Sequence, residues 1–202
     1  MSSSNKCCLN LGSGKVDFNR YRDYMKTVHV DQSYKNVTPL ETIVNEFTTE
    51  FVESRQYLHQ SNIFDFIDSF PYKFDAVFAE RIFEHMDYTS GKIGRLLEGI
   101  NVLTNPDAEL TIVVPNAILL AKMLLGYEDA NVTRCHINDL NTKLIINTEF
   151  NNGLFDPHLS IWTPKLAHEY IESEGTWRIG AIEEQIKFAG RDIYMRIFCC
   201  KT

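Results

Sequence analysis

Two short segments near the amino terminus combine residues that could bind a nucleoside. A mostly apolar run, residues 7–11, stops at Gly12-Ser13-Gly14, and the next apolar run stops at Asp31. Glycines at the end of a buried strand let a ligand approach the main chain, because no Cβ stands in the way. A carboxylate at the tip of a neighbouring strand can accept hydrogen bonds from both hydroxyls of a ribose. Together the two segments predict a pocket for an adenosine-bearing cofactor.

Two other glycine motifs resemble this turn and can be compared with it. A phosphate-binding loop needs Ser or Thr after Lys15, where Val16 stands, and a glycine five positions before Gly14, which is absent. The dinucleotide pattern Gly-x-Gly-x-x-Gly fails because residue 17 is Asp. A phosphate loop is therefore disfavoured. A NAD-dependent oxidoreductase stays as an alternative, because nicotinamide-binding folds also pair a glycine turn with a strand-end acid.

The elements that must position these residues alternate along the chain. Residues 74–79 form a near-continuous apolar run, typical of a strand buried on both faces. Alternation of strands and helices implies a parallel sheet covered by helices on both faces, and the last two strands are expected to be antiparallel. The expected strands are residues 7–11, 27–31, 55–59, 74–79, 109–115, 181–187 and 192–200, and the expected helices are residues 39–54, 89–103, 117–125 and 164–174.

Local signals indicate where several of these elements begin or end. Thr89 or Ser90 is expected to cap the helix that follows it. Residues 105–107, Asn-Pro-Asp, are expected to form a turn. Thr163 can cap the late helix, and Pro164 suits the first helical position.

The composition is that of an ordinary folded domain. With 202 residues, 44% hydrophobic and 23% charged, we expect one domain over residues 1–202. No apolar run approaches the ~20 residues of a membrane helix, and the first residues lack the apolar core of a secretory signal. We therefore expect a cytoplasmic protein with no membrane partner. The net charge of −7, without a dense Lys/Arg cluster, disfavours nucleic acid as a partner.

The cysteines do not predict a metal or redox site. They stand at positions 7, 8, 135, 199 and 200, and no Cys-x-x-Cys occurs. Each of the two adjacent pairs lies in an apolar, strand-like run. Free cysteine is readily buried, so we expect each pair to supply small core residues.

Five segments follow one another in an order that carries a resemblance: Leu9-Asn-Leu-Gly-Ser-Gly14, Val30-Asp31, Asn62-Ile-Phe-Asp-Phe66, Phe74-Asp-Ala-Val-Phe-Ala-Glu-Arg-Ile-Phe-Glu-His-Met86 and Leu110-Thr-Ile-Val-Val-Pro115. The set resembles the class I S-adenosylmethionine-dependent methyltransferases over nearly the whole chain. The resemblance implies an α/β fold, a three-layer Rossmann-like sandwich whose mostly parallel seven-stranded sheet has an antiparallel final strand. The interval from Gly14 to Asp31 is short, so the first crossover helix is expected to be short or irregular.

The resemblance also implies S-adenosylmethionine as cofactor and a set of contacts to it. Asp31 would take the ribose hydroxyls, Asn62 and Ile63 would lie beside the adenine, and Glu80 and Arg81 would border the transferring methyl group. The residues implied to bind the cofactor are Leu11, Gly12, Ser13, Gly14, Asp31, Gln32, Asn62, Ile63, Glu80 and Arg81.

Two histidines are candidate catalytic bases, because histidine changes its charge near neutral pH. His85 follows the fourth strand and could instead pack beneath the next helix. His158 lies in residues 126–162, a segment expected either to cover the substrate or to form a solvated loop. Some members of the superfamily bind a divalent metal through a Glu-x-x-Glu-His motif, whose last two residues correspond to Glu84-His85 in this chain. Arg81 stands where the first Glu would be and would repel a cation, so no metal is expected.

The expected activity is methyl transfer from S-adenosylmethionine to a small-molecule acceptor. Two alternatives stay open. The chain could be a non-catalytic module that binds the cofactor in the same fold, or a NAD-dependent oxidoreductase.

Overall fold

The computed structural model describes residues 6–12, 17–49, 53–124, 150–151, 154–155, 159–188 and 191–202. The strands are β1 (Cys7–Leu11), β2 (Lys26–Val30), β3 (Arg55–His59), β4 (Phe74–Glu80), β5 (Thr104–Pro115), β6 (Phe150–Asn151), β7 (Leu154–Phe155), β8 (Trp177–Phe188) and β9 (Arg191–Lys201). The α-helices are α1 (Leu40–Phe47), α2 (Ile63–Ser69), α3 (Lys92–Val102), α4 (Ala117–Leu124) and α6 (Pro164–Glu172), and the 3₁₀ helices are η1 (Phe18–Tyr21) and η2 (Phe83–His85).

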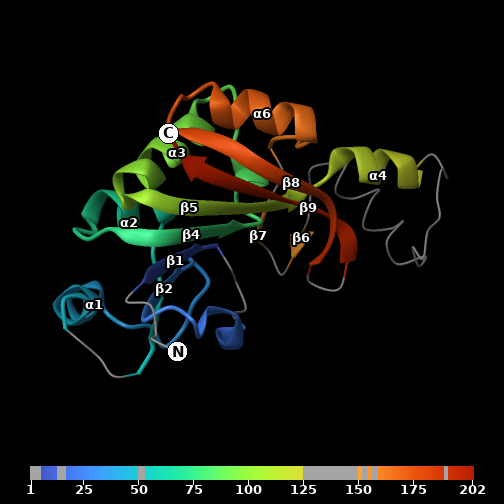
Figure 1. Ribbon diagram of the computed structural model, residues 1–202. Coiled ribbons are helices and arrows are strands. Elements are labelled where there is room, and N and C mark those ends of the chain that lie inside the picture. Colours follow the sequence, from blue (N-terminus) through green and yellow to red (C-terminus); the bar gives the residue numbers. More distant parts are fainter. Residues whose placement is uncertain are drawn as a thin grey trace.

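The expected sheet is confirmed. Seven strands lie in the order β3-β2-β1-β4-β5-β9-β8 (Figure 1). Strands β1 to β5 pair in parallel, and the final strand β9 is antiparallel to both of its neighbours, β5 and β8. The short first crossover is also confirmed, because the four-residue η1 is the helix described between β1 and β2.

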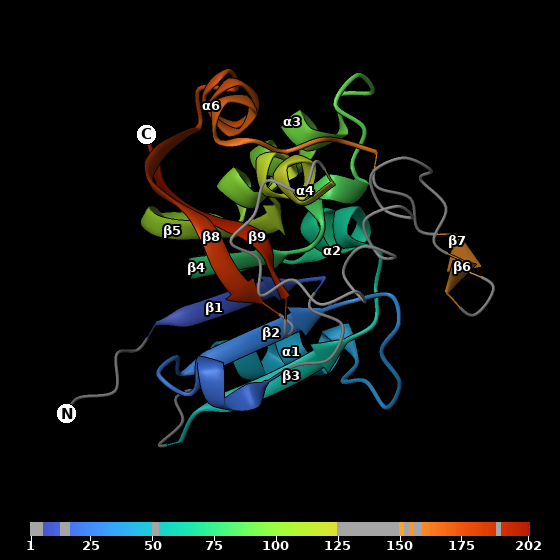
Figure 2. The same ribbon diagram turned by 90° about the vertical axis from the view of Figure 1, so that its right-hand side faces the viewer.

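Helices cover both faces of the sheet, and they do so unequally. Residues of α1, α2, α3 and α6 join one large apolar core with every second residue of the strands, such as Leu9 and Val77. On the opposite face, Tyr21 of η1 packs on Cys8 and Ala76, and Leu120 of α4 packs on β5 and β9. Figure 2 shows η1, the short blue helix, in front of β2 and β3, and α1 behind them. The crossovers through η1 and α1 move in the same direction across the sheet but lie on opposite faces, so they have opposite hands.

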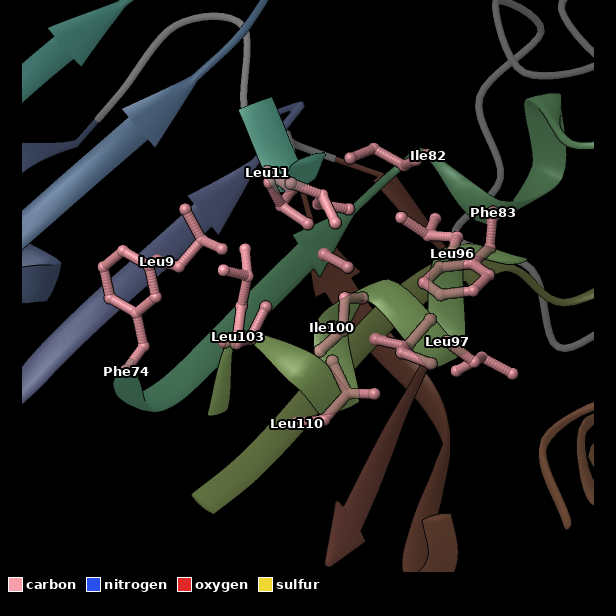
Figure 3. Close-up of a cluster of buried hydrophobic side chains, with 14 of the residues drawn as sticks. Leu9, Leu11, Phe74, Ile82, Phe83, Leu96, Leu97, Ile100, Leu103 and Leu110 are labelled. Atoms are coloured by element: carbon pink, nitrogen blue, oxygen red, sulfur yellow. The ribbon is translucent and has the colours of Figure 1, made fainter. Parts of the chain in front are cut away.

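The larger core explains why α3 forms and where it lies. Ile93, Leu96, Leu97 and Ile100 are all buried and recur at helical spacing on one side of α3. Figure 3 shows three of them facing the β-strand residues, with Leu110 of β5 beneath α3. Trp177, the first residue of β8, also joins this core, and its indole N–H donates to the Leu97 carbonyl at 3.2 Å.

Several local predictions are wrong, and the structure gives the reason. Gly91 occupies the N-cap position of α3 with φ +71°, so neither Thr89 nor Ser90 caps the helix. Thr89 instead donates its backbone and hydroxyl protons to Asp87, 2.9 and 2.8 Å away. Residues 105–107 are not a free turn, because they lie within β5, where an irregularity in the β4–β5 register accommodates the proline.

The remaining boundaries differ less. The helix expected over residues 39–54 ends at Phe47. Of the cysteine pairs, Cys8 and Cys199 are buried as expected, whereas Cys200 is exposed and that part of the prediction is wrong. Successive strand residues face opposite sides, and the side of β9 that Cys200 faces is open to solvent at this end of the sheet.

Candidate functional site

The turns that follow β1, β2, β3 and β4 lie in a row at one edge of the sheet. Leu11 at the end of β1 pairs in register with Val30 of β2 and Ala79 of β4, and Val30 pairs with His59 of β3. The described residues that come next, among them Gly12, Asp31 and Arg81, therefore emerge side by side. Between β1 and β4 the connections leave in opposite directions, and open α/β sheets bind ligands at such a switch point.

Gly12 begins the turn after β1 and adopts a left-handed backbone conformation, φ +64°. Its N–H donates to the Val30 carbonyl at 2.8 Å, which ties the turn to β2. The space that a Cβ of residue 12 would occupy is filled by the Ile82 side chain. The expectation that this side of Gly12 is open to a ligand is therefore wrong, because packing against the turn after β4 uses it.

Part of the predicted site lies outside the described residues. Ser13, Gly14 and His158 belong to this part, as do residues 126–149, 152–153 and 156–157 of the segment 126–162. Their predicted roles stay predictions.

Asp31 follows β2 and is half-buried. Its Oδ1 accepts hydrogen bonds from the Ser33 N–H at 2.7 Å and the Ser33 hydroxyl at 2.6 Å. These bonds hold the carboxylate in one orientation at the edge of the sheet. Gln32 next to it is exposed, and its carbonyl accepts a hydrogen bond from the Gln60 side chain at 2.9 Å.

Asn62 and Ile63 open α2 after β3. Asn62 is the N-cap, and its Oδ1 accepts the Phe64 N–H at 2.9 Å, which satisfies one of the free donors of the helix end. Ile63 packs partly buried against the main core. The cap leaves the Asn62 amide group at the exposed start of the helix, beside the row of turns.

Glu80 ends β4 and is 4% exposed. Its carboxylate forms an ion pair with Arg20 of η1, on the face of the sheet that η1 covers. Burial raises the pKa of the Glu80 carboxyl, although the nearby guanidinium groups of Arg20, Arg196 and Arg81 act in the opposite direction. The nearest partner of Glu80 is thus a residue of the first crossover.

Arg81 is exposed and has φ +57°, which is uncommon for a residue with a side chain. Its N–H donates to the Val113 carbonyl at 2.8 Å, so β5 holds this strained position in place. Strained backbone of this kind concentrates at ligand sites. The left-handed residue also changes the chain direction between Glu80 and Ile82.

His85 ends η2 and is half-buried, and its N–H donates to the Ile82 carbonyl at 2.9 Å. The segment that leads into α6 crosses this short helix. The Leu159 and Ser160 N–H groups donate to the Glu84 carbonyl at 2.7 and 3.1 Å, and the Ser160 hydroxyl donates to the Phe83 carbonyl at 2.9 Å. His85 therefore lies a few residues after the turn that follows β4. Hydrogen bonds from residues 159 and 160 hold its short helix in place.

A buried polar chain runs beneath the row, on the η1 face. The Asn10 amide donates to His29 Nδ1 at 3.0 Å, and His29 Nε2 donates to Gln56 Oε1 at 3.0 Å, when the imidazole is assigned its neutral tautomer. Gln56 in turn donates to the Phe18 carbonyl of η1 at 2.9 Å. Burial lowers the pKa of His29 to about 4.

Sequence reasoning missed Arg20, Ile82 and His29. A carboxylate such as Glu80 at the end of an apolar strand requires a buried partner, and that signal was available. Which cation supplies it depends on where η1 lies. For His29, the signal was a polar residue within an otherwise apolar strand.

Two further properties concern the described residues as a set. Within the described part of the chain, no three His, Cys, Asp or Glu side chains gather as a metal site would require. Nor is any helix of that part long and apolar enough to cross a membrane.

Comparison with known proteins places the fold. No family model matches the chain, and no curated protein matches it. Among solved structures, it is similar to a SAM-dependent methyltransferase from Methanosarcina mazei, with 11% identity and a TM-score of 0.59 over 98% of this chain and 92% of that one. It is also similar to 1,6-didemethyltoxoflavin-N1-methyltransferase from Burkholderia thailandensis, which was solved with 1,6-didemethyltoxoflavin and S-adenosylhomocysteine. Here the identity is 12% and the TM-score 0.60, over 98% of this chain and 71% of that one.

A third similar structure is the pyocyanin biosynthetic protein PhzM, with 10% identity and a TM-score of 0.55 over all of this chain. The chain spans about half of PhzM, 52% of its length. At these identities the likeness defines the fold, which is that of the S-adenosylmethionine-dependent methyltransferases.

Proposed function

We propose that this protein transfers a methyl group from S-adenosylmethionine to a small-molecule acceptor. The row of turns after β1, β2, β3 and β4 supports the proposal most directly. It lies at the switch point of a sheet whose fold is shared with methyltransferases. Gly12, Asp31 and Asn62, predicted as cofactor contacts, belong to three of these turns.

The residues in the row fit an adenosyl group. In this proposal Asp31 accepts hydrogen bonds from the ribose hydroxyls, with Gln32 at the rim, while Asn62 and Ile63 border the adenine. A carboxylate accepts hydroxyl protons, and an amide group can donate to a ring nitrogen. Ser33 already orients the Asp31 carboxylate, and an orientation set before binding lowers the entropic cost of binding.

The cofactor supplies the reactive methyl group when it is bound. The task of the chain is to hold the acceptor atom in line with that group, and positioning can contribute about 7–11 kcal/mol. Arg81 follows β4, where it would border the transferring methyl. An oxygen or amine acceptor must also lose a proton, and His85 and His158 are the candidate bases.

The acceptor is proposed to be a small molecule, bound in the cytoplasm and covered by residues 126–162. The net charge of −7 disfavours a nucleic acid acceptor. The similar Burkholderia enzyme is solved with a small-molecule acceptor, 1,6-didemethyltoxoflavin. That observation supports the class of acceptor and no particular compound.

Titration calorimetry with S-adenosylhomocysteine tests the proposal. We expect the wild-type protein to bind it and Asp31→Ala to bind roughly a hundredfold more weakly, because each hydrogen bond to a charged group contributes about 1.5–3 kcal/mol. Absence of binding by the wild type, or binding of NAD in its place, would contradict the proposal.

Asp87 offers a matched control. Its Oδ1 accepts from the Thr89 N–H and hydroxyl in the same way that Asp31 accepts from Ser33. Asp87→Ala therefore removes the same type of turn contact outside the row. We expect this variant to bind S-adenosylhomocysteine like the wild type.

A further inference from the structure

The glycine turn after β1 has two fixed ends among the described residues. Gly12 is its start, and Asp17, which accepts the Asn19 N–H at 3.1 Å as N-cap of η1, is its end. Both ends contact the same short segment, residues 80–82 at the end of β4. Ile82 fills the space beside Gly12, and Glu80 pairs with Arg20 of η1.

The backbone of Arg81 permits the two contacts. With φ +57°, this residue breaks the strand alternation, so Glu80 and Ile82 do not point to the same side as they would in a continued strand. Glu80 stays on the η1 face, while Ile82 joins the core on the other face, next to Leu11 in the cluster of Figure 3.

Arg20 is itself held in place from several directions. Its guanidinium lies 5.2 Å from the ring centre of Phe78 and 5.7 Å from that of Tyr21. The Arg20 side chain is 31% exposed, whereas that of Glu80 is 5% exposed. Further contacts join η1 to β1, β2, β3 and the middle of β4, and the ion pair adds a contact with the carboxyl end of β4.

Stability alone gives a weak reason for a charge pair at this place. Removing two charges from water is costly, and well-packed apolar residues would serve stability as well. The raised pKa of Glu80 agrees with this, because burial acts on the carboxyl more strongly than three guanidinium groups do. A directional pair does fix the position of η1, which packing alone does less specifically.

We infer that Glu80 is a positioning residue for the cofactor: through Arg20 it fixes η1, and thereby the carboxyl end of the glycine turn, against the end of β4. Ile82 fixes the other end of the turn through Gly12. The inference rests on the proposed function, because it assigns the turn to cofactor binding. It replaces direct contact with the methyl group as the main role of Glu80.

The test measures S-adenosylhomocysteine binding and amide hydrogen exchange in Glu80→Gln and Arg20→Met. We expect each variant to bind roughly tenfold more weakly than the wild type. The double variant should bind like either single variant, because the pair acts as one unit. Arg20→Lys, which keeps the charge, should restore most of the affinity. If Glu80→Gln does not fold, Arg20→Met, at the more exposed partner, still decides the outcome.

Hydrogen exchange separates positioning from general stability. In Glu80→Gln, exchange should rise at the amides of Gly12 and Arg20, which donate to Val30 and Asp17, and not in α3. Asp68→Asn removes the exposed ion pair with Arg95 and serves as control for both measurements. Wild-type affinity with wild-type exchange in both Glu80→Gln and Arg20→Met would overturn the inference and leave the proposed function intact. Loss of binding by the wild type itself would overturn the proposed function instead, and the exchange data would then decide whether the pair fixes η1.

Discussion

Ile82 influences the candidate site through its contact with Gly12, which the sequence alone does not predict. It occupies the space on which a side chain at residue 12 would intrude, and it is itself only 4% exposed. Gly12 is therefore required twice, once for its positive φ and once for the approach of Ile82. The glycine of the predicted cofactor turn is in this respect also a packing residue.

Gly12→Ala is expected to lower the free energy of unfolding by about 2–5 kcal/mol, since a left-handed backbone costs ~1–2 kcal/mol with a side chain and overpacking adds ~1–3 kcal/mol. Gly91→Ala is the matched control, because Gly91 also has a positive φ, +71°, with no atom within 4 Å of an added Cβ. It should cost only about 1–2 kcal/mol. Urea unfolding of both variants provides the comparison.

Shortening the neighbour refines this comparison. In an Ile82→Ala background the overlap is gone, so Gly12→Ala should cost at least about 1 kcal/mol less than in the wild type. Equal costs for Gly12→Ala and Gly91→Ala would show that Ile82 can move aside freely, against the present interpretation.

Among the elements, η1 takes the place of a full crossover helix and is held by specific contacts. Tyr21 packs against Cys8 and Ala76, and the Phe18 carbonyl accepts from Gln56 at the end of the polar chain through His29. A four-residue helix has little apolar surface to bury. Its position therefore depends on hydrogen bonds and on the Arg20–Glu80 pair.

The His29 chain predicts a pH dependence of stability. Folding lowers the pKa of His29 from 6.5 to about 4, so the folded protein keeps the imidazole neutral where the unfolded chain binds a proton. The stabilisation is complete above pH 6.5 and is lost as pH falls from 6.5 to about 4, by about 3 kcal/mol in total.

NMR titration of the His29 ring and urea unfolding at several pH values measure this effect. In His29→Gln the decrease in unfolding free energy between pH 6.5 and 4 should be smaller than in the wild type by a comparable amount. A His29 ring that titrates above pH 6 in the folded protein would contradict the lowered pKa and the pH dependence derived from it.

In the whole molecule, the two faces of the sheet have different tasks. Four helices and the larger apolar core lie on one face, where the folding free energy mainly arises. The other face carries η1, the buried polar chain and the Glu80 ion pair. The row of turns lies at the edge common to both faces. The main core therefore fixes the strand ends, and we expect η1 to position the carboxyl end of the turn after β1.

Ligand binding at that edge should stabilise the whole domain. With S-adenosylhomocysteine at a hundred times its Kd, mass action adds about 2.7 kcal/mol to the unfolding free energy. For a domain of this size that corresponds to a rise in Tm of about 5–10 °C. Differential scanning fluorimetry measures the shift, and Asp31→Ala at the same ligand concentration should show little of it.

The sequence by itself determined most of the architecture. Apolar runs predicted β1 and the positions of β4 and β5, because burial on both faces leaves a local pattern in each segment. The caps of α6 were also local, since Thr163 and Pro164 act within a single turn. Local patterns failed at Thr89 and at residues 105–107, where Asp87 and the pairing with β4 offered stronger partners.

Only the tertiary structure decided which residues meet at the candidate site. Glu80 and Arg20, or Ile82 and Gly12, lie far apart in the chain and are brought together by the strand order and register. A buried carboxylate signals that some partner is needed, but its identity depends on the face that η1 covers. Contacts between distant segments leave no periodic pattern in a sequence, and so the positions of the turns were predictable while the contacts that fix them were not.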